Sequence, residues 1–176
     1  MLKMSLIKRL NSLYWKHFKS PVEYARHLGV KVGDNTFIAI REWSTEPYLI
    51  EIGNNVYITK GVMLHTHGGS SVARRFYPLF DCFGRIIIKD WAYIGAGAQI
   101  MPGVTIGEGS LVAAGSIVTK SVDPFSVVAG NPAKVLCKVD EYIDRNLKYN
   151  LNSKNLTLDE KKALLLSLSD DMFIKK

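Results

Sequence analysis

Large aliphatic residues recur at every sixth position through the middle of this chain, over residues 86–120. The residues that carry this period are Ile88, Ile94, Ile100, Ile106, Val112 and Val118. A helix repeats its apolar residues about every 3.6 positions and a strand about every 2, so a spacing of six fits neither element alone. The spacing predicts a repeating unit in which a short strand is followed by a corner.

A second series of mostly smaller residues has the same period and lies four positions after each aliphatic residue. Its members are Ala92, Ala98, Val104, Ser110, Ser116 and Val122. Because residues two apart in a strand share a face, both series are expected to point inward. Gly95 and Gly107 follow where a tight corner would need backbone freedom. Repeats of this kind stack as a parallel β-helix, whose core is continuous only because neighbouring repeats cover one another.

The same phase holds upstream, but the repeat is interrupted. Three earlier aliphatic residues are in phase with it, namely Ile52, Ile58 and Leu64. Residues 65–85 then stand out as a break in the pattern. An earlier pair, Val32 and Ile38, is out of phase by two residues, which predicts an insertion after it. Since the repeats serve packing and loops carry function, the chemistry is expected in the broken segment 65–85.

The composition is that of one ordinary soluble domain. The chain has 176 residues, of which 47% are hydrophobic, and it is long enough to bury a sizeable core. Cys82 and Cys137 have neither a metal-ligand spacing nor a disulfide-rich pattern, which suits a reducing compartment. No apolar run approaches the ~18–20 residues of a membrane span, and the N-terminus lacks the apolar stretch of a secretion signal. We therefore expect a cytoplasmic protein.

The formal net charge of +7 is concentrated at the front of the chain, since no acidic residue precedes Glu23. The stretch LKMSLIKRLNSLYWKHF has leucines at helical spacing and predicts a basic amphipathic helix within residues 1–28. Two roles are open for it: a cap on the end of the β-helix, or a weak attachment to an anionic membrane surface. Nucleic acid is not expected as a partner, because basic charge without a recognition motif is poor support.

The β-helix is expected over residues 29–138, and residues 139–176 are expected to form a helical tail. In the tail, Thr157 and Glu160 have the spacing of a capping box before an apolar run, which predicts the start of a short helix. The predicted fold class is therefore an all-β solenoid with a short N-terminal helix and a C-terminal helical tail.

Several stretches of this sequence resemble the hexapeptide-repeat acyltransferases, in particular the O-acetyltransferases of surface-polysaccharide synthesis. Beside the hexapeptides, the likeness is carried by GVMLHTHGG and by GSIVTKSVDPFSVVAGNPAKVL. The resemblance implies a left-handed β-helix of triangular section, an exception to the right-handed rule for crossovers. It implies a homotrimer with active sites in the clefts between neighbouring coils. It also implies direct transfer from acetyl-CoA to a hydroxyl of a sugar or glycan, for capsule, lipopolysaccharide or exopolysaccharide, without a metal.

The segment HTHGG supplies a candidate general base. An alcohol must lose its proton as it attacks a thioester, and an imidazole with an ordinary pKa of about 6.5 suits that task. His65 and His67 take the first and third positions after Leu64, neither of which points inward. The resemblance assigns the base to His67 and leaves His65 as a neighbour, although a base at His65 or a structural or acceptor-binding role for both stays open. Gly68 stands where many relatives have an acidic residue, so another group, such as a backbone carbonyl, must orient the ring.

The resemblance also indicates residues for coenzyme A. From the pantetheine arm to the nucleotide end, they are Ala96, Ala114, Thr119, Lys120, Lys134 and Lys138. The alanines would let the arm run along the coil, and the lysines would meet phosphates. The two alanines could equally well be small residues needed for packing. Lys134 and Lys138 could simply be solvated surface lysines.

Candidates for the acceptor lie in the interruption and in the stretch EWSTEPYLIEIG. They are His65, Arg74, Arg75, Phe76 and Tyr77 on one side and Trp43, Glu46 and Tyr48 on the other. Aromatic faces suit sugar rings, and arginines suit phosphate or carboxylate. A structural role explains Trp43 and Tyr48 equally well.

Other functions on this fold remain as alternatives. A serine acetyltransferase normally has a longer N-terminal helical domain than residues 1–28 provide, whereas an O-acetyltransferase of a free small sugar stays open. A γ-class carbonic anhydrase needs three histidines around zinc, and the repeats offer only His65 and His67. A non-catalytic scaffold would have no use for HTHGG. A covalent intermediate is not expected, since there is no G-x-S-x-G motif and no evident base beside Cys82.

Overall fold

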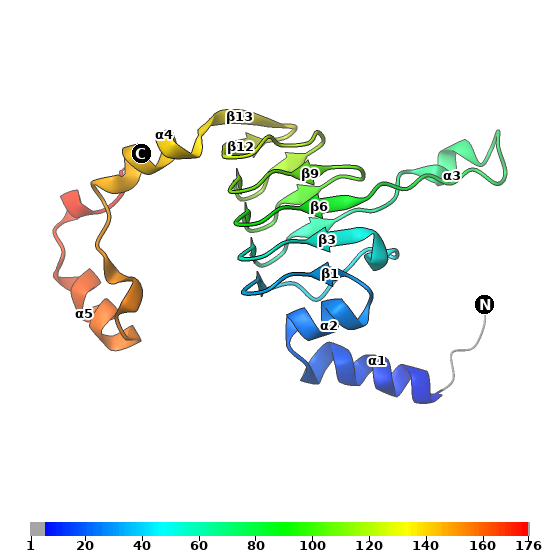
Figure 1. Ribbon diagram of the computed structural model, residues 1–176, viewed down its shortest axis with the longest axis horizontal. Helices are drawn as coiled ribbons and strands as arrows, with labels where there is room; N and C mark the ends of the chain where they lie inside the picture. The colour runs from blue at the N-terminus through cyan, green and yellow to red at the C-terminus, as the bar shows by residue number, and fades with distance from the viewer. Residues whose placement is uncertain (1–5, 176) are drawn as a thin grey trace. The chain divides into compact units, whose positions relative to one another are not determined.

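The computed structural model describes residues 6–175, with side chains from residue 11 onward. Its centre is a stack of very short strands in three sheets (Figure 1). Sheet A contains β1 (Lys31–Val32), β3 (Ile50–Ile52), β6 (Ile86–Ile88) and β9 (Thr105–Ile106). Sheet B contains β2 (Phe37–Ile38), β4 (Tyr57–Ile58), β7 (Tyr93–Ile94), β10 (Leu111–Val112), β12 (Ser126–Gly130) and β13 (Ala133–Lys138). Sheet C contains β5 (Met63–Leu64), β8 (Gln99–Ile100) and β11 (Ile117–Val118).

From β3 to β11 the chain passes through sheets A, B and C in turn and then repeats the cycle, whereas the first cycle has strands in sheets A and B only. Each strand therefore pairs in parallel with the strand one cycle later, as Ile88 does with Ile106 and Ile94 with Val112. Among the strand pairs within residues 6–175, only β12 with β13 is antiparallel. The six-residue period is thus one strand and one corner, and three periods make one cycle.

Both series of residues that were predicted to point inward are buried. The aliphatic residues from Ile88 to Val118 and the smaller residues from Ala92 to Val122 belong to one core, together with Ser110 and Ser116. The buried serine hydroxyls have partners: Ser110 Oγ donates to the carbonyl of Asp123 at 2.8 Å, and Ser116 Oγ accepts from the N–H of Gly130 at 3.2 Å. This satisfies polar groups that would otherwise be costly to bury.

The glycines of the repeats serve two different purposes. A Cβ on Gly95 would lie 2.5 Å from the backbone nitrogen of Ala114, and one on Gly107 would lie 2.4 Å from that of Pro124. The prediction that these two glycines supply backbone freedom is therefore wrong, because close approach of successive cycles excludes a side chain there. Left-handed corners occur instead at residues such as Gly97, with φ of 69°.

Two helices lie at the β1 end of the stack (Figure 1): α1 (Leu6–Phe18) and α2 (Pro21–His27). The first five residues of the predicted N-terminal segment lie outside the described part of the chain. Ser20 begins α2 with a capping box that includes Glu23, and Tyr24 and Ala25 of this helix are buried. The end of the core is therefore closed by α2.

The cycle is interrupted twice. Residues 39–49, with the 3₁₀ turn η1 (Pro47–Leu49), connect β2 to β3, and residues 65–85, with the short helix α3 (Ser70–Ala73), connect β5 to β6. The second interruption leaves and rejoins the stack as two paired arms, in which His67 bridges to Phe83 and the N–H of Gly84 donates to the carbonyl of Thr66 at 2.8 Å. Figure 1 shows it extending away from the stacked strands.

The chain divides into two compact units, residues up to 139 and residues 140 onward. The second unit has α4 (Val139–Leu147) at the boundary, followed by η2 (Ser153–Asn155), α5 (Leu158–Ser167) and η3 (Asp170–Met172). The predicted capping box is confirmed, because Thr157 and Glu160 bond to one another's backbone N–H groups at the start of α5. Over residues 6–175 no helix has both the length and the apolar character needed to cross a membrane.

Candidate active site

The two histidines of HTHGG stand directly after β5, where the repeat breaks. The inward alternation of the strand continues past Leu64 to Thr66, which is fully buried. His65 and His67 consequently point outward, as the spacing predicted. The side chain of His67 is 47% exposed, so its ring is accessible to a substrate.

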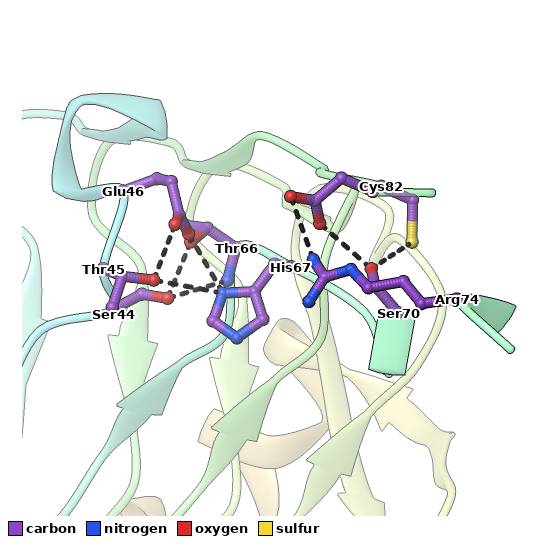
Figure 2. Close-up of polar contacts among 9 residues, drawn as sticks. Ser44, Thr45, Glu46, Thr66, His67, Ser70, Arg74 and Cys82 are labelled. Carbon is purple, nitrogen blue, oxygen red and sulfur yellow. Dashed lines mark hydrogen bonds and ion pairs between the residues drawn. The ribbon is translucent and has the colours of Figure 1, made fainter. Parts of the chain in front are cut away.

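Glu46 holds one nitrogen of the His67 ring (Figure 2). Its Oε2 lies 3.0 Å from Nδ1 of His67, and its side chain is only 16% exposed. Glu46 comes from the first interruption and His67 from the second, so both breaks in the repeat meet at this point. The sequence required an orienting group from outside HTHGG and suggested a backbone carbonyl. A carboxylate occupies that position instead.

Hydroxyl groups hold Glu46 in its ionised form. Thr45 Oγ1 donates to Oε1 of Glu46 at 2.6 Å, and Thr66 Oγ1 donates to Oε2 at 2.7 Å. These two hydrogen bonds, followed by that from His67, lower the pKa of Glu46 from 4.5 to about 2 against the opposing effect of desolvation. A carboxylate with this pKa is an acceptor only, at any pH at which the protein works.

Ser44 supports the buried threonine from behind. Its Oγ lies 2.6 Å from Oγ1 of Thr66 and accepts the N–H of Thr66 at 3.3 Å. Because Thr66 gives its hydroxyl proton to Glu46, the hydroxyl of Ser44 is the donor in the shorter contact. Three consecutive hydrogen bonds thus run from Ser44 through Thr66 and Glu46 to the His67 ring.

This arrangement fixes the tautomer of His67. An ionised Glu46 can only accept, so the neutral imidazole carries its proton on Nδ1 and has a lone pair on Nε2. His67 lines a groove of about 270 Å³ whose other lining residues are Glu42, Trp43, Ser44, Thr45, Met63, Leu64 and His65. A hydroxyl bound in this groove would find a proton acceptor at Nε2.

The other candidates near this groove are arranged differently. His65 Nε2 lies 3.2 Å from Oε1 of Gln99 on β8, and an amide oxygen can only accept, so that nitrogen carries the proton. Trp43 packs against the core, and its Nε1 is buried with no hydrogen-bond partner among the described residues. Tyr48 is exposed and lines a separate hollow of about 240 Å³ with Lys31 and Arg85.

The residues of the loop 65–85 fall into two groups. Arg74, drawn in Figure 2, is engaged within the loop. Its Nε donates to the carbonyl of Phe80 at 2.9 Å, and its guanidinium lies 3.3 Å from the carboxylate of Asp81. The neighbouring residues Arg75, Phe76 and Tyr77 are exposed. Unlike Arg74, these three residues are not tied to Asp81, and they could contact an acceptor.

The candidates for coenzyme A lie at several places around sheet C. Ala96 and Ala114 are exposed at successive corners before it, and they stack, because the N–H of Gly115 donates to the carbonyl of Ala96 at 2.8 Å. Thr119 and Lys120 are exposed at the corner that follows the last strand of sheet C. The remaining two, Lys134 and Lys138, are on β13, where Nζ of Lys138 donates to Oγ of Ser126 at 3.0 Å.

The sequence did not identify the polar residues behind the histidine. The sequence indicates Glu46 for acceptor contact and does not point to Ser44, Thr45 or Thr66. Thr66 could have been found, because a polar residue at an inward position of a strand needs a partner. In the described part of the chain, no three or more His, Cys, Asp or Glu side chains are grouped so as to hold a metal ion.

Comparison with known proteins identifies the family. Residues 85–120 match the family model described as bacterial transferase hexapeptide, six repeats. Protein CapG of Staphylococcus aureus is 44% identical over 146 residues, which cover 81% of this chain and 85% of that protein. A hexapeptide-repeat acetyltransferase of Vibrio cholerae, solved with acetyl coenzyme A, is 28% identical with a TM-score of 0.63 over 73% of this chain and 82% of its own.

The fold extends to more distant enzymes. A maltose O-acetyltransferase of Clostridium difficile superimposes with a TM-score of 0.52 over 79% of each chain, at 24% identity. With the repeats, the stacked parallel strands and the similarity to CapG taken together, this chain belongs to the hexapeptide-repeat acyltransferase family of enzymes.

Proposed function

We propose that this protein is an acetyl-CoA-dependent O-acetyltransferase that acetylates a sugar hydroxyl in the synthesis of a surface polysaccharide. The observation that carries the proposal is the His67–Glu46 pair at the wall of an open groove. The acetyl donor is supported by the solved relative with acetyl coenzyme A. The sugar acceptor is supported by the resemblance of HTHGG and EWSTEPYLIEIG to the polysaccharide O-acetyltransferases.

The proposed reaction is direct transfer with His67 as general base. Nε2 of His67 takes the proton of the acceptor hydroxyl while that oxygen attacks the thioester carbonyl. Ionised Glu46, at Nδ1, stabilises the imidazolium that forms. The tetrahedral intermediate then expels the thiolate of coenzyme A, which receives the proton, and the products are an acetyl ester and free coenzyme A.

The surface around sheet C fits coenzyme A. At the corners that carry Ala96 and Ala114, a Cβ added at Gly97 or Gly115 would meet nothing within 4 Å, so an open strip of backbone is available to an extended pantetheine arm. Exposed Thr119 and Lys120 at the far edge of sheet C would contact the nucleotide end. Lys134 and Lys138 on β13 would complete the phosphate contacts.

We also propose the finer features that the family resemblance implies. The cycle of three sheets would be a left-handed β-helix over residues 29–138, with residues 1–28 and 139–176 as flanking segments. Three copies would form a homotrimer whose active sites lie in the clefts between coils. The protein would act in the cytoplasm, because its proposed donor, acetyl-CoA, is made there.

Release of thiol from acetyl-CoA with a panel of acceptors tests the function. The panel should contain free sugars, nucleotide-linked and polymeric sugars, and serine, and coenzyme A binding should be measured by calorimetry in parallel. Wild-type protein should turn over a sugar acceptor, and His67→Ala should lose about 10²–10⁴ of kcat while still binding coenzyme A. His65→Ala is the matched control. Full activity of His67→Ala would refute the mechanism, and absence of coenzyme A binding to wild type would favour a non-catalytic scaffold.

A further inference from the structure

Helix α1 packs on the rest of its unit through one side. The ring of Trp15 stacks on that of His27, with centroids 4.1 Å apart. Nζ of Lys16 lies 2.7 Å from Oε1 of Glu42, and the guanidinium of Arg41 donates to backbone carbonyls of α1 and of the residue that follows it. These contacts hold the C-terminal half of α1 in a defined orientation.

The opposite side of α1 is uncovered and mostly apolar, with exposed His17 among its apolar residues. The exposed fractions of Leu13, Tyr14 and Phe18 are 53%, 49% and 79%, and the rings of Tyr14 and Phe18 stack with centroids 5.8 Å apart. A surface helix of a globular protein normally turns such residues toward the core. Here the core is closed by α2, so this side of α1 is available to another surface.

The charge around α1 selects the kind of surface. No acidic residue precedes Glu23, whereas five lysine and arginine residues do, namely Lys3, Lys8, Arg9, Lys16 and Lys19. The carboxylates of Glu42 and Glu23 pair with Lys16 and Lys19. The excess of positive charge in the sequence is therefore that of Lys3, Lys8 and Arg9. A second copy would bring an identical basic segment against this one in a two-fold contact, and like charges would oppose that contact. An anionic surface would be attracted.

We propose that α1 binds the surface of an anionic lipid bilayer, with Leu13, Tyr14 and Phe18 among the lipid headgroups. An apolar side with aromatic rings beside an excess of lysine and arginine is the character of helices that lie in the membrane interface. A single helix of this length binds weakly. In a cyclic trimer, symmetry would place three copies of α1 at one height along the axis, and their binding would combine.

Flotation of the full-length protein with lipid vesicles tests this inference. Two vesicle types are needed, one of phosphatidylglycerol with phosphatidylcholine and one of phosphatidylcholine alone, each at low and at high salt. We expect wild type to float with the anionic vesicles at low salt only. The double variant Leu13→Ser/Phe18→Ser should lose about tenfold or more of the bound fraction. Leu166→Ser, at a leucine of the second unit whose exposed fraction of 77% is close to that of Phe18, is the control.

The other outcomes overturn the inference. Equal flotation of wild type and the double variant would mean that this side of α1 does not contact lipid. A change in the sedimentation coefficient of the double variant without vesicles would mean that it contacts another copy of the chain. Circular dichroism melting of both variants verifies that they fold, and Tyr14→Ser gives a second, independent substitution on the same side.

Discussion

The carboxylate of Glu46 lies 3.0 Å from Nδ1 of His67, across 21 positions of sequence. The chain makes one full cycle through sheets A, B and C on the way from one residue to the other, so the pair exists only once the stack has formed. Neither residue belongs to the hexapeptide pattern.

Replacing Glu46 with glutamine should reduce catalysis and leave donor binding unchanged. The amide of Glu46→Gln can donate to Nδ1 as well as accept from it, so the ring is no longer restricted to the tautomer with a lone pair at Nε2. We expect kcat to fall by about 10²-fold or more, with the KM for acetyl-CoA within about twofold. Glu51→Gln, an exposed carboxylate paired with Lys31, should retain wild-type kinetics.

Removing the hydroxyl of Thr66 should weaken both the pair and the fold. Thr66→Val keeps the shape of the buried side chain but leaves Ser44 and Glu46 each without one hydrogen bond. We expect a loss of about 1–3 kcal/mol in the free energy of unfolding and a fall of about tenfold in kcat. Urea denaturation and thiol release measure the two effects. Thr66→Ser, which restores the hydroxyl, should recover kcat, and failure to recover would exclude the hydrogen bond as the cause.

Glu46 should remain ionised well into the acid range. Its pKa in the folded protein is about 2, below the ordinary value of 4.5. A lowered pKa contributes stability that is complete above 4.5 and is lost as the pH falls from 4.5 toward 2. Carbon NMR of the carboxyl should therefore show no titration of Glu46 near pH 4.5. The stability advantage of wild type over Glu46→Gln should shrink across the same window, and an advantage independent of pH would contradict this account.

Replacing Gly95 with alanine should lower the free energy of unfolding more than replacing Gly97 with alanine. Gly95→Ala would place a Cβ 2.5 Å from the backbone nitrogen of Ala114, and we expect it to cost at least about 3 kcal/mol of unfolding free energy. In Gly97→Ala the added Cβ has open space around it, and the strain is limited to the left-handed φ of this residue. That conformation costs an alanine about 1–2 kcal/mol. Thermal melting of both variants gives the order, and equal losses would refute the explanation by close approach.

Removing the charge of Lys120 should weaken the binding of acetyl-CoA and leave the rate of the chemical step unchanged. If Lys120 contacts the nucleotide end of coenzyme A, Lys120→Ala should raise the KM for acetyl-CoA about tenfold, with kcat little changed. Lys148→Ala, in the second unit, serves as the control for loss of one positive charge. An unchanged KM would remove Lys120 from the proposed coenzyme A site.

The sequence predicted the scaffold because its period is short, strict and carried by many residues. Each hexapeptide places residues such as Ile94 and Ala98 inward, and the same pattern of buried positions recurs in every cycle. The same alternation predicted that the side chain of His67 points outward, where it is accessible. The reason for Gly95 was missed, because the distance between successive cycles is not encoded in a local pattern.

The contacts of Glu46 could not be predicted in the same way. They depend on how two irregular segments, residues 39–49 and 65–85, meet beside the stack, and no periodic rule describes either segment. Arg74 illustrates the same limit. Its charge suggested an acceptor contact, whereas its guanidinium is paired with Asp81 inside the loop.

Both members of the pair come from segments outside the repeats, and so do Ser44, Thr45 and Thr66, which hold Glu46 in place. A graft of residues 65–85 alone from a relative would set a foreign histidine loop against the native Glu46, Thr45 and Ser44. A graft of both segments would carry the hydrogen-bonded chain across intact. Attempts to exchange acceptor preference between relatives should therefore transfer residues 39–49 and 65–85 together and leave the coil unaltered.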